Sequence, residues 1–177
     1  LSSPLAAEAQ AGRVPRVGIL ELASPSASVR GHKAFQQGLR ELGYVEGKNI
    51  ILEYRYADGK LDLLPQLVAD LVRLKVDAIV TRSTAPIRAA KNASKTIPIV
   101  FTNAGAPVED GLVSSLARPG GNVTGLTGLS PELDGKRLEL LKQAFPEVTR
   151  VAFLCTGGSA RGDVRVREVE AVAKTLG

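Results

Sequence analysis

The sequence lacks several residue types on which common functional sites depend. Its 177 residues include no tryptophan, no methionine, one cysteine (Cys155) and one histidine (His32). A single cysteine excludes a framework of disulfides within the chain, and a single histidine excludes a metal site built on two histidines. Cys155 ends the apolar run VAFLC, where an unpaired cysteine is usually a small core residue. We therefore expect no metal site and no structural disulfide.

Aromatic residues and long apolar runs are also scarce. Aromatics make up 4% of the chain, so its core must consist of valine, leucine, isoleucine and alanine. No run of 18 apolar residues occurs, and the sequence therefore predicts no membrane-spanning helix. With 44% apolar and 23% charged residues, the composition is that of a globular protein. Its length fits one domain, or one domain and part of another.

The positive charge is spread along the chain and does not form a binding block. The net charge is +5, yet no cluster of lysine and arginine is interleaved with aromatic residues. Such a distribution is typical of solvated helix faces, and we expect no nucleic-acid partner.

Motifs for cofactors and for catalysis are missing. Neither GxxxxGK[ST] nor GxGxxG is present, so no nucleotide cofactor is predicted. Ser-x-x-Lys and Gly-x-Ser-x-Gly are absent as well. We expect His32 at the surface of an amphipathic helix, and four acids at turns or helix starts: Asp58, Asp62, Glu109 and Asp110. An enzyme on this sequence would lack a recognisable nucleophile, base or carboxylate pair.

The first residues resemble the end of an export signal. They read LSSPLAAEAQ, in which Ala7-Glu8-Ala9 satisfies the small-x-small cleavage rule. We expect residues 1–14 to be the remainder of such a signal, which would place the protein in the periplasm or elsewhere outside the cytoplasm. The alternative is a disordered alanine-rich start.

The stretch 77–127 organises the rest of the chain. Residues 77–81 and 97–102 are short apolar runs, and residues 86–94 between them have the pattern of a helix. Continuous apolar strands that alternate with helices predict a parallel sheet covered on both faces.

The same alternation extends over the whole chain and predicts an α/β fold with a doubly wound parallel sheet. Residues 49–56 alternate between polar and apolar side chains, which indicates an edge strand. We expect further strands at 16–22, 122–127 and 150–155, and further helices at 29–42, from Asp62 onward, and at 110–117, 131–145 and 164–176.

Small polar residues follow the predicted strands where a ligand of an open parallel sheet would bind. Hydroxyls, an amide and helix starts gather at Ser24, Ser26, Ser28, Arg82, Ser83, Thr84 and Asn103. The serines after residue 22 serve either as helix caps or as ligand hydroxyls. Thr84 lies at a helix start, where a cap oxygen and a ligand carboxylate would compete for the same N–H groups.

Several segments resemble substrate-binding proteins of ABC transporters, in the tryptophan-uptake-like branch with a type I periplasmic-binding fold. The longest is GLVSSLARPGGNVTG at 111–125, which contains a Pro-Gly-Gly-Asn turn. The others are RVGIL at 16–20, GLRELGY at 38–44, GKNI at 47–50 and KTIPIVF at 95–101. This resemblance implies two lobes that close on a small molecule and deliver it to a membrane permease.

The chain departs from the family pattern in two respects. Family members are about twice as long, so this chain resembles a first lobe with the start of a second. Where the family reads Asp-Pro-Val after the fourth strand, this chain has Ala106-Pro107-Val108. Ala106 cannot orient a ligand loop or meet a ligand amine as an aspartate could.

The resemblance implies the following organisation. Residues 1–14 are the signal remainder, 15–128 the first lobe, 129–148 a crossover helix and hinge, and 149–177 the first βα unit of an incomplete second lobe. The implied ligand-binding residues are Ser24, Ser26, Ser83, Thr84, Ala85, Asn103, Ala104 and Thr127. Short hydroxyl side chains beside helix starts suit the carboxylate of an amino acid or a similar small ligand.

Two other functions are consistent with the same fold. A ligand-sensing domain of a regulator would have a DNA-binding helix-turn-helix before residue 16, where this chain has a signal-like segment. An enzyme would need the catalytic groups that the sequence does not offer. The incomplete second lobe also predicts that this chain binds its ligand weakly or not at all, since a single lobe encloses only one side of a ligand.

Overall fold

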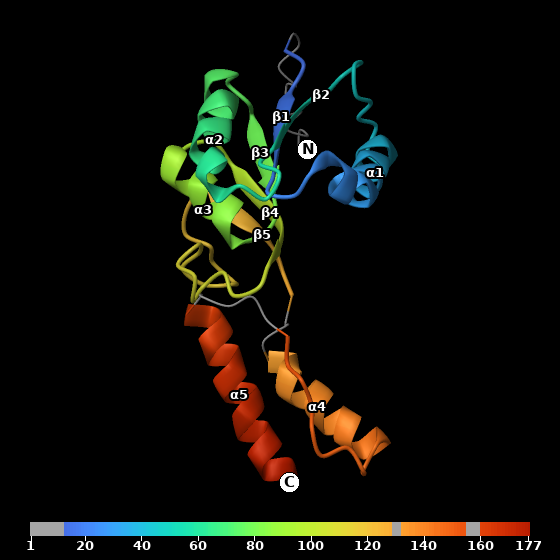
Figure 1. The fold of residues 1–177 in the computed structure, drawn as a ribbon. Coiled ribbons are helices and arrows are strands. Elements are labelled where there is room, and N and C mark those ends of the chain that lie inside the picture. The colour runs from blue at the N-terminus through green and yellow to red at the C-terminus, as the bar shows by residue number, and fades with distance from the viewer. Residues whose placement is uncertain (1–12, 129–131, 155–159) are drawn as a thin grey trace, which may run out of the picture. The chain divides into compact units, whose positions relative to one another are not determined.

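The computed structural model describes residues 13–128, 132–154 and 160–177 (Figure 1). The chain divides into two compact units, Leu1–Thr127 and Gly128–Gly177. We call them the first and the second unit and describe each by itself.

The first unit contains a five-stranded sheet in which all neighbouring strands are parallel. Its strands are β1 (Arg16–Glu21), β2 (Ile51–Tyr56), β3 (Ala78–Thr81), β4 (Ile99–Ala104) and β5 (Val123–Thr127). Their order is β2-β1-β3-β4-β5. The predicted doubly wound parallel sheet is therefore confirmed, as is the edge position of β2. From β1 the chain continues to the neighbouring strand on one side, β2, and then adds β3, β4 and β5 on the other side of β1. The boundary between β1 and β3 is therefore the switch point of the sheet.

One face of the sheet carries the main core. It packs against α2 (Leu64–Arg73) and α3 (Thr84–Ala93), which lie on the same side of the sheet (Figure 1). The inward side chains of α2 recur at helical spacing, and Val68 and Leu71 are fully buried. The strands supply Leu20, Ile79, Ile99, Phe101 and Val123 to the same cluster.

The opposite face is covered only in part. Helix α1 (Pro25–Glu41) lies on this side (Figure 1), and its Gln36 donates to the Tyr54 hydroxyl of β2 at 3.1 Å. On β4 and β5 the same face is open: Val100 is 37% exposed and Leu126 72%. Within the first unit, the helices therefore cover only part of this face.

The handedness of the connections explains this asymmetry. Crossovers between parallel strands are almost always right-handed, so the direction of travel decides the face on which a connection lies. Only the β1–β2 connection runs toward β2, and it carries α1. The later connections all run toward β5, and they carry α2 and α3 on the other face.

Two local predictions, for residues 110–117 and for Asp62, are wrong. Residues 110–117 form turns and bends and not a helix, although Leu112 and Val113 are buried in the core. Asp62 lies inside a 3-10 turn (Leu61–Leu63) and does not cap α2, while Pro65 lies in the first turn of α2 as predicted. A short turn thus starts α2 without a side-chain cap.

The predicted strand at 150–155 is also absent where the structure describes it. Val151–Leu154 has no regular structure, and Cys155 lies outside the described residues. A strand needs a neighbour for its backbone hydrogen bonds, and the described part of the second unit contains no other strand. The side chains of Val151 and Leu154 are 53% and 92% exposed.

The second unit consists mainly of α4 (Glu132–Ala144) and α5 (Ala160–Leu176). A nearly buried carboxylate joins them: Asp134 lies 2.8 Å from Arg137 Nη1 on α4 and 2.6 Å from Arg165 Nη2 on α5. The predicted hinge at 129–148 falls partly outside the described residues, and its described part is mostly α4.

Two residues of the 111–125 segment explain its local structure. The Asn122 side chain donates to the carbonyls of Ser94 and Ile97, at 3.0 and 2.8 Å, and so fixes the loop before β4. Gly125 lies against β4, where an added Cβ would be only 2.0 Å from the Phe101 carbonyl oxygen. The β4–β5 pairing therefore requires glycine at this position.

We expect Gly125→Ala to destabilise the first unit by about 3 kcal/mol or more, because its methyl group would meet backbone and not a flexible side chain. Urea unfolding would measure the change. The control is Gly31→Ala inside α1, where an added Cβ has no neighbour within 4 Å. That change should stabilise the protein by about 0.5–1 kcal/mol. Equal stabilities of the Gly125→Ala variant and the wild type would contradict the structure.

We also expect the amides of Val151–Leu154 to exchange with solvent rapidly, because this segment lacks a strand partner in the structure. Hydrogen exchange followed by NMR at a concentration where the protein is monomeric would test this, with the amides of β3 as the protected reference. Strong protection of the 151–154 amides would show that a strand forms there.

Candidate ligand site at the carboxyl edge of the sheet

All the predicted ligand-binding residues lie in the first unit, at or just after the ends of four strands. Ser24 and Ser26 follow β1, and the segment 83–85 follows β3. Asn103 and Ala104 are the last two residues of β4, and Thr127 ends β5. Because the strands are parallel, these ends share one edge of the sheet, on both sides of the switch point.

At the end of β1, the serine hydroxyls are engaged in local structure. Ser24 is the N-cap of α1, and its Oγ accepts a hydrogen bond from the Ala27 N–H at 3.4 Å. The same Oγ lies 3.0 Å from Ser26 Oγ. Ser28 is 2% exposed, and its hydroxyl has no hydrogen-bond partner in the described structure. The capping role of Ser24 is thus established by geometry, while Ser28 is an unexplained buried hydroxyl.

At the end of β3, the start of α3 is left without a side-chain cap. The N-cap is Ser83 and not Thr84, which is the first helical residue. The Ser83 side chain makes no cap hydrogen bond, and its backbone has φ +70° and ψ 148°. This region is almost restricted to glycine and costs about 1–3 kcal/mol for other residues. Thr84 Oγ1 instead donates to Asp110 Oδ2 at 2.9 Å.

The ends of β4 and β5 are tied together. Thr127 Oγ1 donates to the Ala104 carbonyl at 2.6 Å. The Ala104 side chain is buried in the core, so its methyl group faces away from solvent. Asn103 is exposed, and its carbonyl accepts a hydrogen bond from the Ser83 N–H at 2.9 Å, which joins the ends of β3 and β4.

A buried charge cluster that sequence reasoning missed lies beside this edge. Glu21, at the end of β1, has a side chain only 9% exposed. One carboxylate oxygen lies 2.9 Å from Arg82 Nε, and the other 3.3 Å from His32 Nε2. Arg82 is the residue after β3, and His32 belongs to α1. The expected surface position of His32 is therefore wrong, since its side chain is 15% exposed.

The cluster extends to β2 through Tyr56, whose hydroxyl lies 3.2 Å from His32 Nδ1. Burial raises the pKa of the Tyr56 hydroxyl, and the negative charge of Glu21 raises it further. Tyr56 therefore stays protonated at neutral pH and can donate to Nδ1. Both ring nitrogens of His32 thus lie within hydrogen-bond distance of an oxygen, Nδ1 of the Tyr56 hydroxyl and Nε2 of the Glu21 carboxylate. The sequence signal was an acid that ends an otherwise apolar strand.

Asp110 is a second acid that the sequence did not assign to this edge. Ala106 brings no carboxylate to the loop after β4, but Asp110, four residues later, places one beside Thr84. The Asp110 carbonyl also accepts a hydrogen bond from Arg88 of α3 at 3.1 Å. These two hydrogen bonds attach the loop after β4 to α3.

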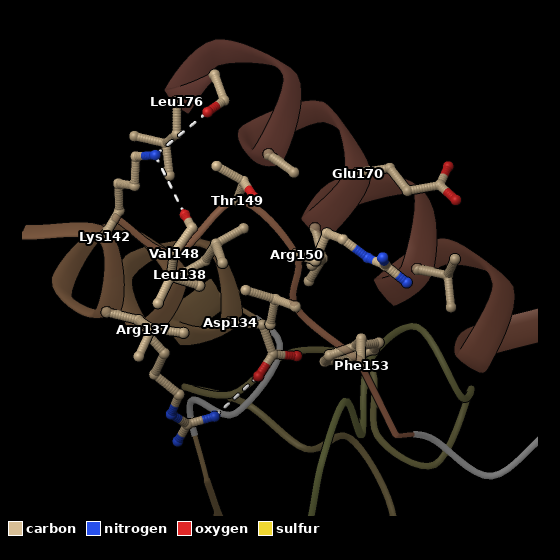
Figure 2. A pocket seen from close by; sticks show the side chains of 16 residues that line it. Asp134, Arg137, Leu138, Lys142, Val148, Thr149, Arg150, Phe153, Glu170 and Leu176 are labelled. Atoms are coloured by element: carbon tan, nitrogen blue, oxygen red, sulfur yellow. Dashed lines mark hydrogen bonds and ion pairs between the residues drawn. The ribbon is translucent and has the colours of Figure 1, made fainter. Parts of the chain in front are cut away.

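A cavity of about 730 Å³ lies elsewhere, inside the second unit. Its walls are α4, α5 and residues 148–153, and leucine and valine side chains dominate them. Figure 2 shows Lys142 at one end, where its Nζ donates to the Val148 carbonyl at 3.2 Å, and Arg137 against Asp134. None of the predicted ligand-binding residues lines it.

The described residues offer little for other chemistries. Among them, no group of three or more histidine, cysteine, aspartate or glutamate side chains could hold a metal ion. None of the helices in the described parts of the chain has both the length and the apolar run that a membrane crossing requires.

We expect Glu21→Gln to destabilise the first unit by about 2 kcal/mol, because it removes charge-assisted hydrogen bonds to Arg82 and His32 from a nearly buried site. Thermal and urea unfolding would measure this. The control is Arg73→Gln, which removes a salt bridge whose arginine is 77% exposed and should change stability by less than about 0.5 kcal/mol. Equal effects of the two variants would mean that the Glu21 contacts contribute no more than a surface pair.

A family model, a related protein and solved structures all match this chain. A model of the ABC transporter substrate binding protein family matches residues 16–177. A tyrosine-binding protein of Clostridioides difficile (strain R20291) is 32% identical over 158 residues, which cover 89% of this chain and 45% of that protein.

Solved structures agree. A conserved domain protein from Vibrio cholerae has 31% identity and a TM-score of 0.81, over 92% of this chain and 54% of the other. An ABC domain from Streptococcus pneumoniae in complex with L-Trp has 26% identity and a TM-score of 0.80, over 93% and 55%. The chain thus spans about half the length of these relatives. Because the family model matches most of the chain, the chain belongs to the ABC transporter substrate-binding protein family.

Proposed function

We propose that the chain is the ligand-binding part of an extracytoplasmic solute-binding protein of an ABC importer, and that its ligand is an amino acid or a similar small carboxylate. The single observation that carries this proposal is the convergence of polar residues from β1, β3, β4 and β5 at one edge of a parallel sheet. The related proteins support the ligand class, because one is a tyrosine-binding protein and another binds L-Trp.

The ligand would lie at the switch point, against the starts of α1 and α3. Helix α3 begins there without a side-chain cap, so its first N–H groups can meet a carboxylate. Ser83 and Asn103 would contribute exposed polar groups from neighbouring strand ends. Ser24, Ser26, Thr84, Ala85, Ala104 and Thr127 would shape the same edge.

We further propose that residues 15–128 form the first lobe, that 129–148 include the hinge, and that 149–177 begin a second lobe. Two features of the second unit support this division. The segment Val151–Leu154 has the apolar sequence of a buried strand, but in the described residues it has no strand to pair with. It also lines an apolar cavity between α4 and α5, a space that further strands of a second sheet would fill.

In this proposal the complete protein closes two lobes on the ligand and delivers it to a membrane permease. The present chain would enclose only one side of the ligand, and affinity normally depends on enclosing most of its surface. We therefore expect this chain to bind more weakly than about micromolar, with no catalytic step.

A titration of the isotope-labelled chain with L-tryptophan, L-tyrosine and L-leucine, followed by amide NMR, would test the site. We expect shifts at residues 24–26, 83–85, 103–104 and 127, with millimolar dissociation constants. Asn103→Ala should weaken binding several-fold. The matched control, Asn92→Ala on the exposed side of α3, should not.

Two results would count against the proposal. Shifts confined to the second unit would mean that the carboxyl edge of the sheet is not the site. A sub-micromolar affinity in calorimetry would refute the view that one lobe is insufficient.

A further inference from the structure

We propose that Arg82 binds the carboxylate of the ligand, and that Glu21 and His32 orient it for that role. This inference rests on the proposed function, because it concerns the same site. Arg82 follows directly after β3, at the switch point, and precedes Ser83 in the chain. From the sequence, the expected donors to a carboxylate are short hydroxyl side chains and helix-start N–H groups, and Arg82 has no assigned role.

The structure leaves few of those hydroxyls able to donate. A hydroxyl has one proton to give. Thr84 Oγ1 donates its proton to Asp110, and Thr127 Oγ1 donates to the Ala104 carbonyl. Ser24 and Ser26 hydrogen-bond to each other, so one of their two protons is used. The first N–H groups of α3, the Ser83 hydroxyl and one serine proton remain, but none of these groups offers two parallel donors on a single side chain.

Arg82 can supply a pair of hydrogen-bond donors to a ligand carboxylate. A guanidinium carries five N–H groups in a planar fork that matches a carboxylate. In this structure Nε donates to Glu21 Oε2 at 2.9 Å. The two terminal nitrogens have no recorded partner among the described residues, and the side chain is 39% exposed. The terminal N–H groups can therefore form two parallel hydrogen bonds to a carboxylate.

The cluster behind Arg82 holds it in place. Glu21 is nearly buried on β1, and its second oxygen is bound by His32 of α1, which in turn contacts Tyr56 of β2. The anchor of Arg82 is thus attached to three elements of the fold. A side chain held in this way loses less conformational freedom when a ligand binds.

The same contacts limit the size of the expected effect. Glu21 balances the charge of Arg82, so the pair is neutral and attracts a distant anion weakly. The contribution of Arg82 then comes from direct hydrogen bonds to the ligand, for which a loss of about tenfold in affinity is expected.

The test compares L-tryptophan with L-tryptophanamide, which replaces the carboxylate by a neutral amide. Amide NMR titrations give both dissociation constants for the whole 177-residue chain. We expect the wild type to bind the acid about tenfold more tightly than the amide. Arg82→Gln should bind the acid about tenfold more weakly and leave the amide unchanged, so that the preference disappears.

Two further variants complete the design. Arg88→Gln makes the same change of charge on α3, where the guanidinium donates to the Asp110 backbone carbonyl, and it should keep the preference for the acid. The double variant Glu21→Gln/Arg82→Gln leaves no unpaired buried charge, and it should lose the preference even where Arg82→Gln alone fails to fold.

The outcomes separate this inference from the proposed function. A preference for the acid that survives in folded Arg82→Gln or in the double variant would overturn the inference and leave the proposed function intact. Wild-type shifts confined to the second unit with either compound would overturn both. If Arg88→Gln also loses the preference for the acid, the preference depends on the overall charge of the protein. That result would overturn the specific role of Arg82.

Discussion

The right-handed connection between parallel strands is the constraint on which the rest of this structure depends. It places α1 on one face of the sheet and α2 and α3 on the other, because the chain changes its direction of travel at β1. The parallel direction of the strands brings the carboxyl ends of all five to one edge. The core, the uncovered part of β4 and β5, and the candidate ligand site all follow from this arrangement.

Much of the first unit could be predicted from the sequence, since its signals are local. Apolar runs of four to six residues between helical patterns identified all five strands to within two residues. The alternation at 49–56 identified β2 as an edge strand. The prediction of a strand at 150–155 was wrong for a physical reason. An apolar run shows that a segment can form a strand, but the strand forms only where a neighbouring strand accepts its hydrogen bonds.

The candidate site was predictable in position but less so in its chemistry. The polar residues after the strands were expected to share one edge of the sheet, and they do so because parallel strands end together. The contacts of Glu21 with Arg82 and of Thr84 with Asp110 join residues 61 and 26 positions apart, and no local pattern reveals such pairs. The sequence therefore suggested hydroxyl donors, while the structure shows several of these hydroxyls engaged in internal hydrogen bonds.

The backbone of Ser83 has a further consequence for how a ligand would be received. Its strained conformation turns the chain sharply at the start of α3 before any ligand is present, and the Ser83 N–H is already fixed to Asn103. The ordering of this turn is therefore completed when the protein folds. A ligand that used the first N–H groups of α3 would meet a preorganised surface, and its affinity would not be reduced by the entropy of arranging that turn.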